Sequence, residues 1–303
     1  MCEENGHVVE FEHGMNYAVA GATTLSSQLL VDEGIQNLMT NVSLEVQLRC
    51  FKQLLPSICG TASGNAIFVI QLPLTKFSNL IGHSLILVGE IGGNDYNFLI
   101  RGGKSIDEIK SLVPLVVKKI VSTINELIET GAQTLVVPGN LPLGCTADHL
   151  TTAQGSENEE YDPTTGCLNR INQLAEYHNQ MLQKELNHIR DLHSNVNIIY
   201  ADYFNAAMQI YRFPYKYGFT NGALKACCGG GGPFNYNSTA PCGYEYATMC
   251  DEPYTYVNWD GVHLTEATYK FMFEGLFQGP YTTPAFKSLC SLSSHVGVGI
   301  STY

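Results

Sequence analysis

The stretch SLILVGEI (84–91) decides how the middle of this chain is expected to fold. It is built around a continuous apolar run, and glycines stand on both sides of it. A continuous run, in contrast to an alternating one, is typical of a strand that is buried on both faces of a parallel sheet. The sequence therefore predicts a buried parallel strand here.

The next strong pattern predicts a long helix over 105–131. Ser105 and Glu108 form a capping box at its start, and Gly131 ends it. Pro114 falls inside the helix and can kink it. Apolar residues recur on one helical face, at positions 109, 113, 116, 120, 124 and 127.

Strand and helix continue to alternate toward the end of the chain. Further strands are predicted at 133–139 and 195–202, and further helices at 167–193, at 203–211 and from near Thr265. This alternation predicts an α/β fold whose parallel sheet is covered by helices on both faces.

Nothing in the sequence separates the chain into several domains. There is no internal repeat and no linker, so we expect a single domain over 1–290 and a disordered tail over 291–303. Two long loops, 140–166 and 213–262, interrupt the alternation and carry the clustered cysteines. Loops of this length inside a compact domain are usually functional or cross-linked.

Composition limits the classes of function. Of 303 residues, 45% are hydrophobic and 15% are charged, which suits a globular core and argues against disorder. The formal net charge of −12 argues against a nucleic-acid partner, because an acidic protein gains nothing from counterion release. No apolar run reaches the roughly 18 residues of a membrane span, so none is predicted.

Ten cysteines are many for a chain of this length. Cys145 and Cys167 bracket one loop, and we expect a disulfide between them. Four more fall close together, at positions 227, 228, 242 and 250. Disulfides are the favoured interpretation, although free thiols remain an alternative. Zinc is disfavoured, because no pair has the C-x₂₋₄-C spacing and no histidine lies in the cluster.

Two features bear on the compartment and conflict. Asn41 and Asn237 stand in N-x-[ST] sequons, which fit glycosylation on an oxidising secretory route. The first residues, MCEENGHVVEFEHG, have no basic start and no apolar core, so they do not form a signal peptide. The sequence therefore indicates either a cytosolic protein or a chain that lacks its true beginning.

The first candidate site follows the strand at 84–91. Ligands of open α/β sheets bind beyond the carboxyl ends of the strands, and the turn Gly92-Gly93-Asn94-Asp95 falls there. Glycines permit a sharp turn, and the Asn94 amide can donate a hydrogen bond to a developing oxyanion. The alternative is an ordinary tight turn whose side chains bond their own backbone.

Ser84 lies in the sequence GHSL and looks like a nucleophile motif. It opens the strand that Asn94 follows, and seven residues at roughly 3.3 Å each separate the two ends by about 23 Å. We therefore expect Ser84 to be a strand-start residue and not a nucleophile.

The second candidate is Asp260 with His263, just before a helix. In a loop, this spacing lets the carboxylate bond the imidazole Nδ1–H, which leaves Nε2 as a general base. The alternative is a helix-start aspartate beside an unrelated surface histidine. A third stretch, EHGMNYAVAGATT (12–24), suggests a tight loop at Gly21 that follows a strand and points a backbone N–H outward.

Together these stretches resemble the plant GDSL esterase/lipase family of SGNH hydrolases, in particular the subgroup of acetylajmalan esterase and sinapine esterase. The similarity covers nearly the whole chain and rests on long segments: GMNYAVAGAT, LILVGEIGGNDYN, GKSIDEIKSLVPLVV, VPGNLPLGC, EYDPTTGCLNRIN, NIIYADYFNA, ACCGGGGPFN and YVNWDGVHLTEATY. The resemblance implies a flavodoxin-like, three-layer α/β/α fold around a central parallel sheet.

The resemblance also implies roles for individual residues. The family's catalytic D-x-x-H pair matches Asp260 and His263, and its G-x-N-D block matches Gly92 and Asn94. Its second block supplies an oxyanion-hole glycine, which matches Gly21, with Gly14 as the less favoured candidate.

One block of the family is missing from the sequence. No Gly-Asp-Ser occurs in the 303 residues, so the chain has no matching nucleophile. We interpret the chain as truncated before its first strand, as a gene model, splice form or degenerate copy. The segment 60–82 also departs from the family and lacks a cysteine for Cys59, and neither Cys2 nor Cys50 has an evident partner.

The implied function is hydrolysis of small acyl esters of plant metabolites, such as acetyl or hydroxycinnamoyl esters. The alternative is an inactive homologue, because the nucleophile block is absent. No metal and no organic cofactor is implied. The family implies a secreted or vacuolar location, and the sequence leaves the oligomeric state open.

Overall fold

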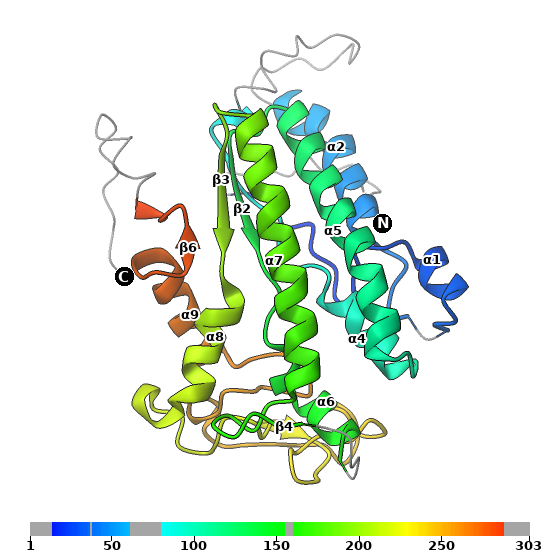
Figure 1. Ribbon diagram of the computed structural model, residues 1–303, viewed down its shortest axis with the longest axis vertical. Coiled ribbons are helices and arrows are strands. Elements are labelled where there is room, and N and C mark those ends of the chain that lie inside the picture. The colour runs from blue at the N-terminus through cyan, green and yellow to red at the C-terminus, as the bar shows by residue number, and fades with distance from the viewer. Residues whose placement is uncertain (1–13, 37, 61–79, 155–159, 288–303) are drawn as a thin grey trace. The chain divides into compact units, whose positions relative to one another are not determined.

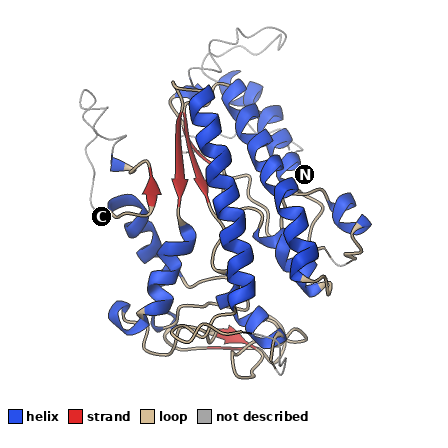
Figure 2. Cartoon of the chain, in the orientation of Figure 1, coloured by secondary structure: helices blue, strands red, loops and turns tan. Residues whose placement is uncertain are grey.

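The computed structural model describes residues 14–36, 38–60, 80–154 and 160–287, with no side chains for 56–60. Helices and strands are interspersed along these residues, with helices between successive strands of the main sheet (Figures 1 and 2). The chain divides into two compact units. The first lies within Met1–Pro138 and Tyr177–Ile198, and the second within Gly139–Glu176 and Ile199–Tyr303. The expected tail at 291–303 and most of the segment 60–82 lie outside the described residues.

The first unit contains the elements that lead to the first candidate site. They are α1 (Ser27–Asp32), α2 (Leu44–Gly60), β1 (Leu85–Leu87), α4 (Gly93–Arg101), α5 (Ile106–Glu129), β2 (Thr134–Pro138), the greater part of α7 (Asn169–Leu192) and the start of β3 (Asn197–Ala201). Helix α5 packs against α2 and α4, and Figure 1 shows α2 and α5 side by side.

Helix α5 begins where its sequence predicts. The Ser105 hydroxyl accepts from the Glu108 N–H at 3.3 Å, and the Glu108 carboxylate accepts from the Ser105 N–H at 2.9 Å. The predicted capping box is therefore confirmed. Pro114 lies inside the helix, and Gly131, with φ +112°, follows its end. The predicted apolar face is buried, at positions 109, 113, 116, 120, 124 and 127.

Strand β1 is parallel to β2, as predicted, with Leu85 opposite Thr134 and Leu87 opposite Val136. It is shorter than the predicted strand, and it is not buried: Leu85 is 50% exposed and Leu87 is 67% exposed. The prediction of burial was wrong, because among the described residues β1 ends the strand order β1-β2-β3-β6. An edge strand has a neighbour on one side only, so its side chains are less covered.

Ser84 directly precedes β1, and its hydroxyl donates to the Leu80 carbonyl at 2.8 Å. The expectation that Ser84 opens the strand is therefore confirmed. The turn predicted at Gly92–Asp95 proves to be the first turn of α4, whose N-cap is Gly92.

The second unit contains the elements around the second candidate site. They are α6 (Ala147–Thr152), the end of β3, α8 (Tyr203–Arg212), β4 (Cys228–Gly229), β5 (Thr248–Met249), α9 (Glu266–Gln278), β6 (Thr282–Thr283) and three short 3₁₀ turns, η1 (Leu143–Cys145), η2 (Pro214–Tyr217) and η3 (Pro253–Thr255). Helices α8 and α9 pack together, and Thr265 caps α9, close to the predicted start.

Strand β6 was not predicted. It pairs antiparallel with β3, with Tyr200 opposite Thr283 and Ala201 opposite Thr282. A strand of two residues leaves no periodicity in the sequence, so only its pairing with β3 reveals it. The sheet is otherwise parallel, and the predicted α/β class is confirmed.

Disulfides fasten both long loops. Cys145 is bonded to Cys167, as predicted, and the cluster forms Cys227–Cys250 and Cys228–Cys242. Cys50 is also disulfide-bonded, so the expectation that it has no partner was wrong.

Candidate active site

The first candidate group is the loop that carries Gly21. Gly21 has φ +76°, and the Ala22 N–H donates to the Val19 carbonyl at 3.0 Å to close a turn. A Cβ at Gly21 would lie 2.6 Å from the Met39 Cβ, so this position requires glycine. Among the described residues no acceptor pairs with the Gly21 N–H. The predicted strand before the loop is absent from residues 14–20.

Asn94 lies next to this loop. Gly92 takes φ +106° as the N-cap of α4, which places Asn94 in the first helical turn. The Asn94 side-chain amide donates to the Ala22 carbonyl at 3.0 Å. An amide nitrogen carries two hydrogens, so one remains for a ligand. The structure therefore brings Asn94 to the residue that follows Gly21, and the turn is not bonded only to its own backbone.

Gly14 was the less favoured oxyanion candidate. It also has a positive φ, +129°, but a Cβ there would meet nothing within 4 Å. No hydrogen bond joins Gly14 to Asn94 in the described part of the chain. Gly21 is therefore the better candidate on geometry.

Asp95 fastens the same loop from the inside. Its two carboxylate oxygens accept from the Thr24 N–H at 2.7 Å and from the Leu25 N–H at 2.8 Å. The side chain is completely buried. Burial raises the pKa of Asp95 to about 7, although the hydrogen bonds from Leu25 and Thr24 act in the opposite direction. Asp95 belongs to the predicted G-x-N-D motif, but its partners lie 71 and 70 residues away and leave no local pattern in the sequence.

A separate cavity of about 470 Å³ lies in the first unit between α2 and α5. Charged residues line much of it, at positions 45, 49, 52, 119 and 126. Neither Gly21 nor Asn94 belongs to its lining, so this cavity is distinct from the pair of candidate donors.

Asp260 and His263 form the second candidate group, in the second unit. Asp260 Oδ1 accepts from the backbone N–H of Val262 and of His263, each at 2.7 Å. Asp260 Oδ2 lies 2.9 Å from His263 Nδ1, so the predicted hydrogen bond is present. An ionised carboxylate only accepts, so Nδ1 carries the proton and Nε2 carries the basic lone pair of the ring.

The environment of this pair suits a general base. The His263 side chain is 68% exposed, whereas Asp260 is 22% exposed. Burial acts to raise the pKa of Asp260, but the hydrogen bonds from His263 and Val262 outweigh it and hold that pKa below its usual value. Asp260 therefore remains an anion that can orient the imidazole and stabilise its protonated form.

The loop of this pair is anchored by a residue that sequence analysis missed. Asn258 is buried, its amide donates to the carbonyls of Cys145 and Leu224 at 3.2 Å each, and its oxygen accepts from the Tyr211 hydroxyl at 2.7 Å. These bonds fix the backbone two residues before Asp260. Asn258 lies in the motif YVNWDGVH, but nothing in that string reveals its distant partners.

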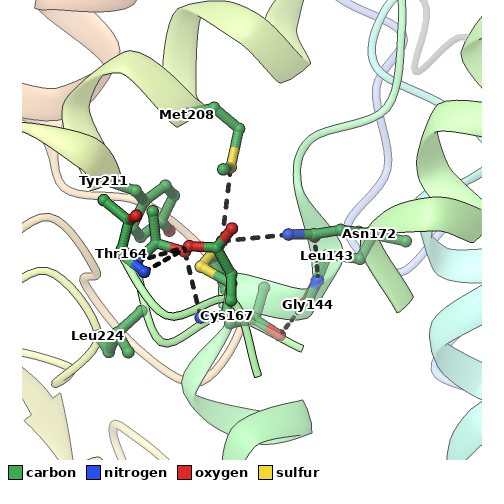
Figure 3. The surroundings of a disulfide bond; sticks show 12 residues. Leu143, Gly144, Thr164, Cys167, Asn172, Met208, Tyr211 and Leu224 are labelled. Atoms are coloured by element: carbon green, nitrogen blue, oxygen red, sulfur yellow. Dashed lines mark hydrogen bonds between the residues drawn. A yellow bond between two sulfur atoms is a disulfide. The ribbon is translucent and has the colours of Figure 1, made fainter. Parts of the chain in front are cut away.

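The disulfide Cys145–Cys167 supports this anchor (Figure 3). Asn172 accepts from the Gly144 N–H at 2.8 Å, and the Leu168 N–H donates to the Gly144 carbonyl at 2.8 Å. A Cβ at Gly144 would lie 2.2 Å from the Leu168 carbonyl oxygen, so only glycine fits. The Cys145 carbonyl that holds Asn258 is therefore itself held in place.

Two further disulfide-bonded cysteines, Cys227 and Cys228, also bond the loop that carries Asp260 and His263. The N–H of Cys227 donates to the Asn258 carbonyl at 2.9 Å, and the N–H of Cys228 donates to the Trp259 carbonyl at 2.7 Å. From α6, the Asp148 N–H donates to the Gly261 carbonyl at 2.9 Å. The segment before His263 is thus held by hydrogen bonds to three of its carbonyl groups, at positions 258, 259 and 261.

The described residues contain no group of three or more His, Cys, Asp or Glu side chains that could hold a metal ion. Within the same residues, no helix combines the length and the apolar character that a membrane crossing requires.

Known proteins give this geometry its context. The family described as GDSL-like Lipase/Acylhydrolase matches residues 3–276. The GDSL esterase/lipase At1g28610 of Arabidopsis thaliana is 49% identical over 92% of this chain and 70% of its own length. The GDSL esterase/lipase At1g28580 of the same plant is 48% identical over 97% and 73%, respectively.

A third relative has a substrate in its name. Sinapine esterase of Brassica napus is 45% identical over 93% of this chain and 70% of its own length. The α/β fold with a mostly parallel sheet agrees with the SGNH hydrolases. The chain belongs to the GDSL-like lipase/acylhydrolase family of ester hydrolases.

Proposed function

We propose that this chain carries the base and the oxyanion-binding groups of a serine ester hydrolase. One observation carries the proposal: Asp260 bonds His263 Nδ1 at 2.9 Å, in a loop that its other oxygen closes, and the His263 side chain is 68% exposed. An imidazole that is oriented in this way and open to solvent can take a proton at Nε2.

The reaction would proceed by acyl transfer. A serine attacks the ester carbonyl while His263 takes its proton, and His263 then protonates the leaving alcohol. His263 next activates water, which releases the acid. The Gly21 N–H and the second hydrogen of the Asn94 amide would stabilise the oxyanion, with Gly92 and Gly93 shaping the turn. The family resemblance assigns the serine to a Gly-Asp-Ser-Leu block.

A second candidate function follows from the absence of a Gly-Asp-Ser-Leu block in this sequence. The 303 residues contain no Gly-Asp-Ser, so the proposal names no nucleophile within them. A homologue without the nucleophile could still bind ester ligands through Asn94, Gly21 and His263. This binding function is the alternative to hydrolysis.

Small acyl esters are the proposed substrates. Because one relative is named sinapine esterase, sinapine is the first ester to test, with acetyl esters as the second class. A secreted or vacuolar location is proposed with glycosylation at Asn41 and Asn237. Both asparagines are exposed, and Asn237 Oδ1 accepts from the Thr239 hydroxyl of its own sequon at 2.8 Å.

The test uses the chain as given and the chain preceded by a Gly-Asp-Ser-Leu segment taken from an Arabidopsis relative. Hydrolysis of p-nitrophenyl acetate and sinapine is measured for each, together with His263→Ala and the matched exposed-histidine control His188→Ala. We expect turnover in the extended form that His263→Ala abolishes and His188→Ala retains. A folded extended form that binds sinapine without turnover would overturn hydrolysis and favour the binding function.

A further inference from the structure

We propose that Asp95 is a positioning residue. It clamps the loop at residues 22–25, and this clamp sets the position of the Gly21 N–H relative to the Asn94 amide, the two proposed oxyanion donors. The proposal rests on the function proposed above for these donors. It assigns to Asp95 a task that the reaction itself does not require, since its two carboxylate oxygens accept from the backbone N–H groups of Thr24 and Leu25.

The clamp joins segments that are far apart in sequence. Asp95 receives the N–H groups of Thr24 and Leu25, which precede it by 71 and 70 residues. Its neighbour Asn94 donates to the Ala22 carbonyl at 3.0 Å. Two consecutive residues of α4 therefore fix three of four consecutive residues in the loop that begins just after Gly21.

A carboxylate suits this task better than any other side chain. Both of its oxygens accept, so each can take one N–H, whereas an asparagine offers one oxygen and a second group that would face a donor. Asp95 also stands in the first turn of α4, where the helix dipole favours a negative charge. Its complete burial means that a lost bond could not be replaced by bulk water.

The rest of the loop is already held on its far side. The Leu44 N–H donates to the Thr23 carbonyl at 2.8 Å, and the Thr23 hydroxyl donates to the Leu25 carbonyl at 2.7 Å. Gly21 is limited by Met39, but it has no such bond of its own among the described residues. The Asn94 amide bonds the Ala22 carbonyl, and the clamp holds Thr24 and Leu25 just beyond it, so together they fix the residues that follow Gly21 against the first turn of α4.

The first experiment uses the 303-residue chain and compares Asp95→Asn with the control Asp162→Asn. Asp162 also accepts two consecutive backbone N–H groups, from Thr164 at 2.9 Å and Thr165 at 2.7 Å, but it belongs to the second unit. Amide hydrogen exchange at Thr24 and Leu25 is measured by NMR, with the resonances of the Gly21 N–H and the Asn94 side-chain amide.

We expect exchange at Thr24 and Leu25 to be at least about 10-fold faster in Asp95→Asn, because a 10-fold change reports about 1.4 kcal/mol of lost local protection. The Gly21 and Asn94 resonances should move as well, and Asp162→Asn should change none of these signals. Faster exchange with unmoved Gly21 and Asn94 resonances would overturn the proposal, as would unchanged exchange.

If Asp95→Asn does not fold, a pH titration of the unmodified chain tests the clamp instead. The Asp95 carboxyl carbon is titrated alongside the Gly21 and Asn94 signals, and these must share its midpoint. Tyr96 and His178, which bond each other at 2.7 Å, are the neighbouring titratable groups and are followed in parallel. Donor signals that follow His178 or Tyr96, or that do not titrate with Asp95, contradict the clamp.

Kinetic measurements distinguish a failure of the positioning role of Asp95 from a failure of the proposed hydrolase function. In the form that carries the Gly-Asp-Ser-Leu segment, we expect Asp95→Asn to lower kcat by about 10- to 100-fold, as small misplacements of catalytic groups do, with KM almost unchanged. An unchanged kcat would overturn the positioning role. If the parent form shows no turnover, the proposed function fails, and the NMR experiment still decides whether the clamp exists.

Discussion

At the scale of single residues, the proposed chemistry depends on carboxylates that bond backbone N–H groups. Asp260 closes its own loop and holds His263, and Asp95 closes a loop that is distant in sequence. The first arrangement could be predicted, because its partners lie within four residues. The second could not, because its partners are 71 and 70 residues away and leave no local pattern.

Asp260→Asn tests the role of the carboxylate in selecting the imidazole tautomer. The asparagine amide would face Nδ1 with a donor, so Nδ1 would lose its proton and Nε2 would gain one. By analogy with other triads, we expect kcat of the extended form to fall by about 10⁴-fold. The tautomer is measured by ¹⁵N NMR of His263 in the 303-residue chain. An Nδ1–H tautomer that persists in Asp260→Asn would contradict this role, and Asp251→Asn serves as an exposed control.

The pH dependence of stability tests the burial of Asp95. Burial raises its folded pKa to about 7, above an unfolded value of about 3.9. Between these values the folded chain binds more protons, so stability from the protonated carboxyl is complete below about pH 4 and is lost as the pH rises through about 7. We expect the stability of the unmodified chain, relative to Asp95→Asn, to decline from pH 4 to 7 in urea unfolding. A difference that rises or stays constant over this range contradicts the burial.

At the scale of elements, the chemistry of helix ends was predictable from sequence and the burial of strands was not. The Ser105–Glu108 box marks the start of α5 because a capping box needs only residues three apart. The exposure of β1 depends on its edge position, which no residue of SLILVGEI encodes. The sequence predicts a turn at the start of α4 because the first residues of this helix, Gly93 and Asn94, are poor helix formers.

Ser105→Ala tests the start of α5. The substitution removes the hydroxyl that accepts from the Glu108 N–H and donates to the Glu108 carboxylate, whereas the backbone N–H of residue 105 remains as a donor to that carboxylate. We expect a loss of about 1 kcal/mol in the free energy of unfolding, measured by urea denaturation. Ser122→Ala, an exposed serine inside the same helix, should instead be neutral or slightly stabilising. Equal effects of the two substitutions would show that the box adds no stability.

At the scale of the whole molecule, the two halves of the proposed chemistry belong to different compact units. Gly21 and Asn94 lie in the first, and Asp260 and His263 lie in the second. The family and the α/β class could be predicted because long motifs carry them, and the disulfide of Cys145 because the two cysteines bracket one loop. The distant partners of Asp95 and Asn258 depend on long-range packing within each unit, which short motifs do not specify.

The distance between His263 Nε2 and Asn94 Nδ2, measured in a crystal structure of this chain, tests most directly whether the four residues form one active site. Three successive contacts of about 3 Å, from base to nucleophile to carbonyl to oxyanion donor, set an upper limit of about 10 Å. We predict a distance within that limit, with Gly21 on the same side. A longer distance would contradict the assignment of these residues to a single ester-hydrolysing site.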